Sequence, residues 1–297
     1  MNKLILLLFA LLCGFSIWQS NLVLTTSHTV LQLFFEVLIP SLFFMMFLLK
    51  VMEQTGLLAY LAKWLRKPAY LLCKATPSEL PYLLSGLCLG FAANAILVKE
   101  AYLQQKISQA SAQRLLYTCH TPTISFCVLT CGTLLQDTNL GLLLFGIQLV
   151  AALLFYRFLS GNDMPLPIHK QKPLLLSLQD ALKTTGFGLY QMAGYILIAS
   201  VILSFITYFL PAELYLPLQS ITDFASSAVA VCKLALPQAH KLLLLSVIFG
   251  FGGFCGHLQV YAMSDPIPLK YHRYFAWRIA QAFFSAGLCF IYISLQV

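Results

Sequence analysis

The residues best suited to binding a solute lie in one apolar stretch near the C-terminal end, LLSVIFGFGGFCGHLQVYAM, residues 244–263. It contains four glycines, Gly250, Gly252, Gly253 and Gly256, and the polar side chains of His257 and Gln259 follow them. Glycine costs about 1 kcal/mol relative to alanine inside a helix, and imidazole and amide groups donate and accept hydrogen bonds. The pattern predicts a helix broken near Gly252-Gly253 that turns the chain back as a re-entrant hairpin. The alternative is a glycine-rich face that lets two helices pack closely.

A second stretch, LLSGLCLGFAANAILVKE at residues 83–100, has the same layout. In both stretches Leu-Leu-Ser precedes Gly-Phe, small residues follow, and a polar group comes next. Here the predicted break is Gly90 and the polar group is Asn94. Interrupted apolar segments at corresponding places of two halves are typical of a transporter's binding site.

A third candidate break lies at His120–Thr123, where Pro122 interrupts a helical pattern. Proline removes one backbone hydrogen bond, and neighbouring Thr and His side chains can replace it at membrane depth. We therefore predict a broken helix whose polar side chains, His120, Thr121 and Thr123, contact a solute together with Asn94, His257 and Gln259. The alternative is an ordinary proline kink.

Two carboxylates, Glu36 and Asp223, lie within apolar segments. An ionisable group inside a membrane is a functional candidate by default, and these two are predicted to carry a coupling proton or cation. The alternative places both near the membrane interface. A metal site is a minority interpretation, because the spacing gives no support to its candidate ligands, Cys119, His120, Cys255 and His257. No metal site is predicted.

Composition indicates a multi-pass protein of the cell membrane. The chain has 297 residues, of which 60% are hydrophobic and 9% charged, with a mean hydropathy of +0.82. The net charge of +8 is better explained by cationic cytoplasmic loops than by nucleic-acid binding. The chain contains no nucleophile elbow, zinc-protease, Walker A or dinucleotide motif, so we expect neither an enzyme nor a cofactor.

The expected fold is all-α, with six full spans and two glycine-broken hairpins in two structural repeats. We expect an N-terminal transmembrane anchor and loop at 1–29, a first repeat at 30–160, a polar linker at 161–185 and a second repeat at 186–297. The segment 57–74 is amphipathic and basic, which is typical of a helix lying at the membrane interface. Segment 211–233 is interfacial or half-inserted, and Ser108 is an expected N-cap for a helix starting near Gln109.

Several segments resemble the YlbJ/SpoVV group of sporulation integral membrane proteins: IPSLFFMMFLL, RLLYTCHTP, LQSITDFASSAVAV and GFGGFCGHLQVYAM. That group carries the nucleoside-recognition (Gate) domain, which is also found in concentrative nucleoside transporters and in the membrane part of the ferrous iron transporter FeoB. The resemblance covers roughly residues 30–295. It implies inverted repeats, passage of a dipicolinate-like or nucleoside-like solute, and a role in spore formation. The chain departs from the group's motifs at Ala92–Ala95 and Cys119–Thr123.

The sequence therefore predicts a transporter or permease for a small polar or anionic solute. A ferrous-ion permease and a non-transporting membrane scaffold remain as alternatives, and a homo-oligomeric state is left open. If both hairpins enter from the cytoplasm, all 18 Lys and Arg residues lie on the cytoplasmic side, as the positive-inside rule favours. Inverted repeats would bring the second hairpin in from the opposite face, and we favour this arrangement because a two-sided gate needs both.

Overall fold

The computed structural model describes residues 2–159, 161 and 172–296. Every regular element in this part of the chain is a helix. Four helices are long and apolar enough to cross a membrane, or up to six if each of two sharply bent pairs counts as one span. The prediction of an all-α, multi-pass membrane protein is confirmed at this level. The upper figure equals the predicted number of full spans, but it includes Gln238–Ser264, most of which we predicted to be a hairpin.

The elements before residue 160 are α1 (Asn2–Trp18), α2 (Ser20–Leu33), the π-helical turn η1 (Phe34–Leu38), α3 (Ile39–Gln54), α4 (Leu57–Cys73), α5 (Leu80–Leu89), α6 (Phe91–Leu103), α7 (Gln109–Thr118), the π-helical turn η2 (Phe126–Gly132) and α8 (Thr138–Phe158). The later elements are α9 (Leu174–Tyr208), the 3₁₀ turn η3 (Ala212–Leu214), α10 (Tyr215–Thr222), α11 (Phe224–Lys233), α12 (Gln238–Phe251), α13 (Gly253–Ser264) and α14 (Tyr271–Gln296).

Side-chain caps fix where two of these helices begin. The hydroxyl of Ser108 accepts a hydrogen bond from the backbone N–H of Ser111 at 3.1 Å, so α7 begins at Gln109 as predicted. The Asp137 carboxylate accepts from the backbone N–H of Asn139 at 2.8 Å and starts α8. Each cap satisfies a backbone donor that the first turn of a helix leaves open.

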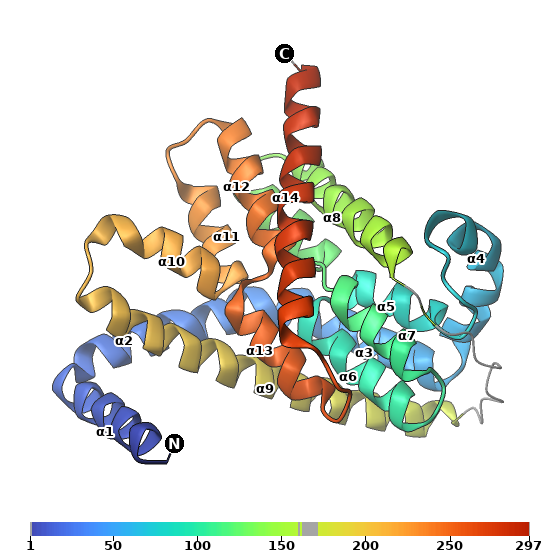
Figure 1. The fold of residues 1–297 in the computed structure, drawn as a ribbon, viewed down its shortest axis with the longest axis horizontal. Coiled ribbons are helices and arrows are strands. Elements are labelled where there is room, and N and C mark those ends of the chain that lie inside the picture. The colour runs from blue at the N-terminus through green and yellow to red at the C-terminus, as the bar shows by residue number, and fades with distance from the viewer. Residues whose placement is uncertain (1, 160, 162–171, 297) are drawn as a thin grey trace.

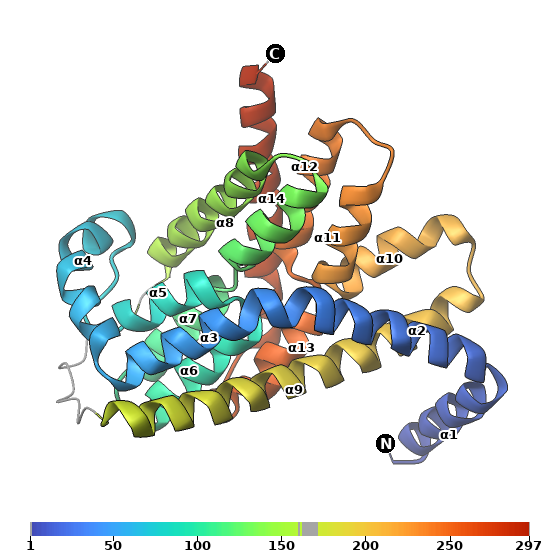
Figure 2. The ribbon, with the colours of Figure 1, turned by 180° about the vertical axis from the view of Figure 1, so that it is seen from behind.

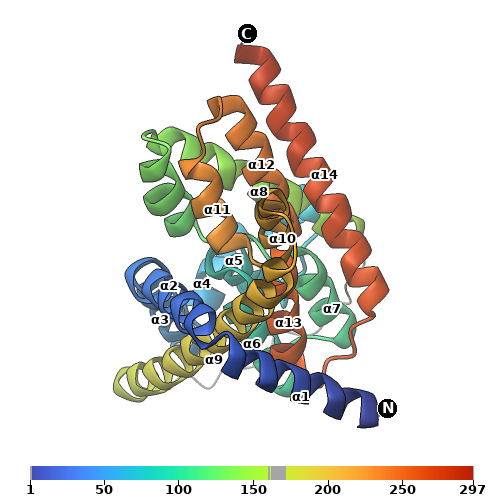
Figure 3. The ribbon, with the colours of Figure 1, turned by 90° about the vertical axis from the view of Figure 1, so that its left-hand side faces the viewer.

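The longest helix, α9, lies beside the continuous run of α2, η1 and α3 (Figures 1 and 2). It begins at Leu174, so the predicted polar linker 161–185 is already helical in about its last half. Residues 162–171 of that linker lie outside the described residues. Helix α1 projects from the body (Figures 1 and 3), and its Phe15 ring packs 4.3 Å from the ring of Phe205.

A second group of helices is built around α14, which packs along α12 and against α8 (Figures 1 and 3). A Cβ atom added to Gly250 of α12 would lie 2.5 Å from the Cα of Ala282 on α14. Gly250 therefore permits close helix packing and does not form the break that we predicted for it. The same correction applies to Gly256, which is buried inside α13.

The break predicted at Gly252-Gly253 is present, with both residues at positive φ (+88° and +70°). However, α12 and α13 follow one another within a single 27-residue apolar span, Gln238–Ser264 (Figure 1). The re-entrant hairpin predicted here is therefore wrong, because the glycines interrupt a span without turning it back. The chain folds back instead at Asp223, where α10 packs against α11, just as α5 packs against α6 around Gly90.

A buried ion pair and its hydrogen bonds join α4, α5, α7 and α8. Arg114 of α7 lies 3.1 Å from the carboxylate of Glu79, and both side chains are almost fully buried. The same guanidinium donates to the carbonyl oxygens of Cys73 (2.9 Å) and Tyr156 (2.9 Å). One cation thus satisfies acceptors at the end of α4, the start of α5 and the end of α8, and it stacks on the Tyr156 ring.

We expect Gly250→Ala to destabilise the protein by about 1–3 kcal/mol, because one added methyl group overpacks the contact between α12 and α14. The matched control is Gly194→Ala in α9, where an added Cβ meets nothing within 4 Å. Both changes improve helix propensity equally, so only packing distinguishes them. Thermal unfolding of the purified variants in detergent measures the difference. Equal or higher stability of Gly250→Ala would contradict the assigned helix contact.

Candidate functional site

The helices are interrupted at four places whose backbones touch in pairs: Gly90, Cys119–Thr123, Asp223 and Gly252–Gly253. A Cβ atom on Gly90 would lie 3.3 Å from the carbonyl oxygen of Thr121. A Cβ atom on Gly253 would lie 3.0 Å from the carbonyl oxygen of Thr222 and 3.0 Å from the nitrogen of Phe224. The first break therefore contacts the second, and the third contacts the fourth, at approaches that a larger side chain would prevent.

The end of α12 is closed by Arg278 of α14. This guanidinium is fully buried, and it donates to the carbonyl oxygens of Phe251 at 3.1 Å and Phe249 at 3.3 Å. It also donates to Gln281 at 2.8 Å. The last carbonyls of a helix have no partner within the helix, and a cation at that end is also favoured by the helix dipole.

In the first half of the chain, two predicted site residues likewise donate hydrogen bonds to carbonyl oxygens near helix ends. The amide of Asn94 donates to the carbonyl oxygen of Cys119 at 3.3 Å, and the hydroxyl of Thr121 donates to the carbonyl oxygen of Leu87 at 3.3 Å. Both side chains are fully buried. Asn94 and Thr121 therefore tie the first two breaks together.

Two of the helix N-termini at the breaks are capped by their own side chains. The Thr123 hydroxyl accepts from the backbone N–H of Phe126 at 3.1 Å, and the Asp223 carboxylate accepts from the backbone N–H of Ser226 at 2.8 Å. We predicted that half-helix N-termini offer free N–H groups to a ligand. At these two helices a donor is already engaged, whereas α6 begins at Gly90 without a side-chain cap.

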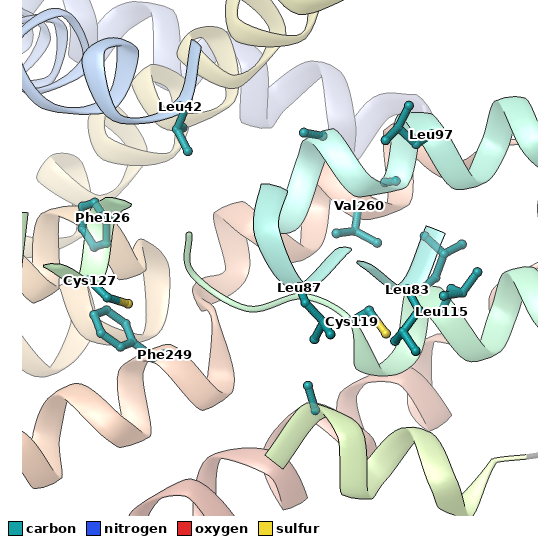
Figure 4. Packing of buried hydrophobic residues seen from close by; sticks show 14 of the residues in the cluster. Leu42, Leu83, Leu87, Leu97, Leu115, Cys119, Phe126, Cys127, Phe249 and Val260 are labelled. Atoms are coloured by element: carbon teal, nitrogen blue, oxygen red, sulfur yellow. The ribbon is translucent and has the colours of Figure 1, made fainter. Parts of the chain in front are cut away.

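A small cavity lies where the breaks meet, and we call it the central cavity. It is lined by Leu38, Leu42, Gly90, Pro122, Thr123, Phe126, Met192, Ile196, Asp223, Phe224, Ala225, Gly256 and Gln259. Its volume is about 30 Å³, which admits about two water molecules. The rings of Phe126, Phe224 and Phe249 pack together at one side, with centroids 5.8–6.4 Å apart. Figure 4 shows Phe126 and Phe249 in the apolar core, with Leu42 above them.

A larger cavity, lined by both polar and apolar side chains, adjoins the central cavity, and we call it the vestibule. Its volume is about 630 Å³, and its lining includes Thr25, Thr29, Gln32, Glu36, Ser200, Tyr215, Gln219, Asp223, Ser226 and Lys233. Asp223 lines both cavities. The two predicted coupling carboxylates thus share one space, although Glu36 is exposed and receives a hydrogen bond from Gln32 at 3.0 Å, whereas Asp223 is buried.

The two predicted histidines lie together on either side of Tyr274, away from the lining of both cavities. The Tyr274 hydroxyl lies 2.9 Å from Nδ1 of His257, and the Tyr274 ring is 6.4 Å from the ring of His120. Nε2 of His257 and Oδ1 of Asn94 are buried and have no partner among the described residues. Buried polar atoms of this kind usually mark a functional group or an ordered water.

The structure thus separates the six predicted binding residues into two groups. Thr123 and Gln259 line the central cavity, whereas the other four pack behind it: Asn94, His120, Thr121 and His257. Sequence reasoning missed Tyr274 and Arg278, although an arginine inside an apolar span is itself a signal of a functional or structural role. It also missed Thr25, Thr29 and Gln32 of α2, which continue the helical spacing of the predicted Glu36 in η1 and could have been found by that spacing.

No group of three or more His, Cys, Asp or Glu side chains in the described part of the chain is arranged to hold a metal ion. The alternative site formed by Cys119, His120, Cys255 and His257 therefore gains no geometric support. Comparison with known proteins yields no matching family model, no matching curated protein and no matching solved structure.

We expect Arg278→Met to destabilise the protein by about 3 kcal/mol, because it leaves buried carbonyls of α12 without a donor. Arg278→Lys should recover only part of this loss, since a single ammonium group lacks the planar fork of donors. Arg273→Met, an exposed change on the same helix, is the control. Thermal unfolding in detergent compares the three. A wild-type midpoint for Arg278→Met would show that the broken end of α12 does not need this cation.

Proposed function

We propose that this protein is a cell-membrane transporter for a small polar solute, with the central cavity as its binding site. The observation that carries the proposal is that three helix breaks from both halves of the chain line one cavity, at Gly90, Pro122–Thr123 and Asp223, while the fourth, at Gly253, contacts the third. Asp223 also connects this cavity to a ligand-sized vestibule. Broken helices at membrane depth are tolerated where they line a cavity, and transporters use them to bind solutes.

The order of the helices supports the proposal, and we infer an internal repeat from it. In this repeat each half contains a span, a short hairpin, a broken span and a final span in the same order. The pairs are α5–α6 with α10–α11, α7–η2 with α12–α13, and α8 with α14. With these pairs, the glycine-rich stretch 244–263 corresponds to the break after α7, and not to the hairpin at Gly90. The resemblance to the Gate-domain proteins implies inverted repeats too, but there the stretch 244–263 was expected to be the second hairpin.

The lining of the central cavity favours an uncharged hydrogen-bonding solute over a free dianion. Thr123 and Gln259 offer hydrogen bonds, whereas the Asp223 carboxylate repels an anion in a space with little water. An anionic solute such as dipicolinate would fit best with a proton on Asp223 or on the solute. Asp223 is therefore the stronger candidate for coupling, since it is buried and lines both cavities, whereas the Glu36 side chain is exposed.

The two volumes indicate a closed binding site beneath an open vestibule. A cavity of about 30 Å³ cannot hold a nucleoside, whereas 630 Å³ lies within the usual range for ligand pockets. Solute entry would require the tip of the α10–α11 hairpin, at Asp223 and Phe224, to move away from the cavity. The backbone of Gly253, at the start of α13, closely approaches the backbone of this tip. The hairpin and the broken span would therefore move together.

Uptake by protein reconstituted in liposomes tests the proposal with three radiolabelled solutes: uridine, dipicolinate and ferrous ion. We expect uptake of the nucleoside, and a fall of about ten-fold in Gln259→Leu, because one buried hydrogen bond to the solute is lost. Gln179→Leu, an exposed change on α9, should transport normally. Uptake of ferrous ion alone would favour the metal permease, and no uptake of any of the three would favour the scaffold.

The repeat predicts that the two hairpins enter the membrane from opposite faces. In Figures 1 and 2, α5, α6 and α7 lie on one side of the molecular centre, and α10, α11 and the start of α12 on the other. Single cysteines at Gln104 and Gln238, both exposed, should react with an impermeant maleimide from opposite sides in a cysteine-depleted background. Labelling of both from one side would contradict the inverted repeat.

A further inference from the structure

Helix α4 is set apart from the spans by its direction and its charge. It follows the second half of α3 at an angle of 87°. From Gln54 to Ser78 the chain contains basic residues but no Asp or Glu. An amphipathic helix that turns sharply away from a span is suited to lie in the plane of the membrane surface.

One face of α4 packs on the protein and a second is apolar and exposed. At 100° per residue, the buried side chains Leu58, Ala62 and Cys73 share the face that contacts the body. The adjoining face presents four large apolar side chains that remain exposed: Leu61, Trp64, Leu65 and Leu72, of which Trp64 is 73% exposed. Such a stripe would be costly in water and is favourable in contact with acyl chains.

The third face of α4 is basic. Lys63, Arg66 and Lys67 are spaced i, i+3 and i+4, so they lie on one side of the helix, and all three are exposed. Tyr60 and Tyr70 flank them, as aromatic residues do at membrane interfaces. Within the described residues none of the three cations forms an ion pair.

The C-terminal end of α4 is held in place by a further cation. Arg157, in the last turn of α8, donates to the carbonyl oxygens of Leu71 at 2.7 Å and Leu72 at 3.1 Å. Lys74, which follows the helix, is exposed and adopts a left-handed conformation. The basic face is therefore fixed in direction relative to the body of the protein.

We propose that α4 lies at the membrane surface and binds the headgroups of anionic phospholipids through Lys63, Arg66 and Lys67. The apolar face would enter the upper acyl region while the basic face remains at the depth of the phosphates, where long Lys and Arg side chains can reach them. A soluble acidic partner is disfavoured, because it would leave the stripe of Leu61, Leu65 and Leu72 without an apolar contact. The proposal is independent of whether the protein transports a solute.

Quenching of Trp64 by brominated lipids provides the test. The full chain carries Trp18→Phe and Trp277→Phe, which leaves Trp64 as its only tryptophan. It is reconstituted into vesicles of equal parts phosphatidylglycerol and phosphatidylcholine, with bromine on the acyl chains of one lipid at a time. Because one basic residue near an anionic surface supports roughly a five-fold preference, we expect quenching by the brominated phosphatidylglycerol to be at least about two-fold stronger.

The variant Lys63→Gln/Arg66→Gln/Lys67→Gln should show equal quenching by the two lipids. The control Lys3→Gln/Lys183→Gln/Lys270→Gln removes three exposed charges elsewhere and should keep the preference. Raising the salt concentration should weaken the preference, because surface charges are screened. Equal quenching in the wild-type helix, no quenching by either lipid, or the same loss in the control would each overturn the proposal.

Discussion

The structure depends on one constraint: every backbone donor and acceptor at a broken helix must find a partner inside the protein, because hydrocarbon provides none. Each break meets this constraint with a different side chain. Thr121 bonds to a carbonyl oxygen near the end of α5, Asn94 closes α7 and Arg278 closes α12. Thr123 and Asp223 cap the helices that follow their own breaks. The residues that satisfy the backbone are therefore polar groups buried in an apolar core, and they bring the four breaks to one place.

Because these side chains bond to the backbone at the breaks, few of the buried polar groups line the cavities. A side chain that is already bonded to a carbonyl serves the fold first, and only its remaining atom can serve a ligand. Asn94 shows both roles, since its amide nitrogen donates to Cys119 while its oxygen stays unpaired. His257 is similar, with one ring nitrogen beside Tyr274 and the other unpaired. The polar groups behind the central cavity thus retain unused hydrogen-bonding capacity.

Much of the local structure could be predicted from the sequence, whereas the path of the chain could not. Glycine and proline patterns located the interruptions at Gly90, Gly252-Gly253 and His120–Thr123, because these residues change helix energetics wherever they occur. They could not show whether a break turns the chain back. That depends on tertiary packing, so Asp223, flanked by no glycine or proline, forms a fold-back and Gly252 does not. Gly250 and Gly256 were misread because a packing glycine and a breaking glycine look alike in sequence.

Helix α9 has a mechanical consequence. Its 35 residues make a rod about 52 Å long, which exceeds the hydrocarbon thickness of about 30 Å. Lys172, just before the helix, forms an exposed ion pair with Asp180 in its second turn, and these charges mark the end suited to water. Further along, Met192 and Ile196 form a wall of the central cavity, and Ser200 and Leu203 form a wall of the vestibule. A stiff rod of this kind acts as a lever, so a swing of about 5° at one end displaces the other by about 4.5 Å. A force applied to the aqueous end of α9 would therefore reach both cavities at once.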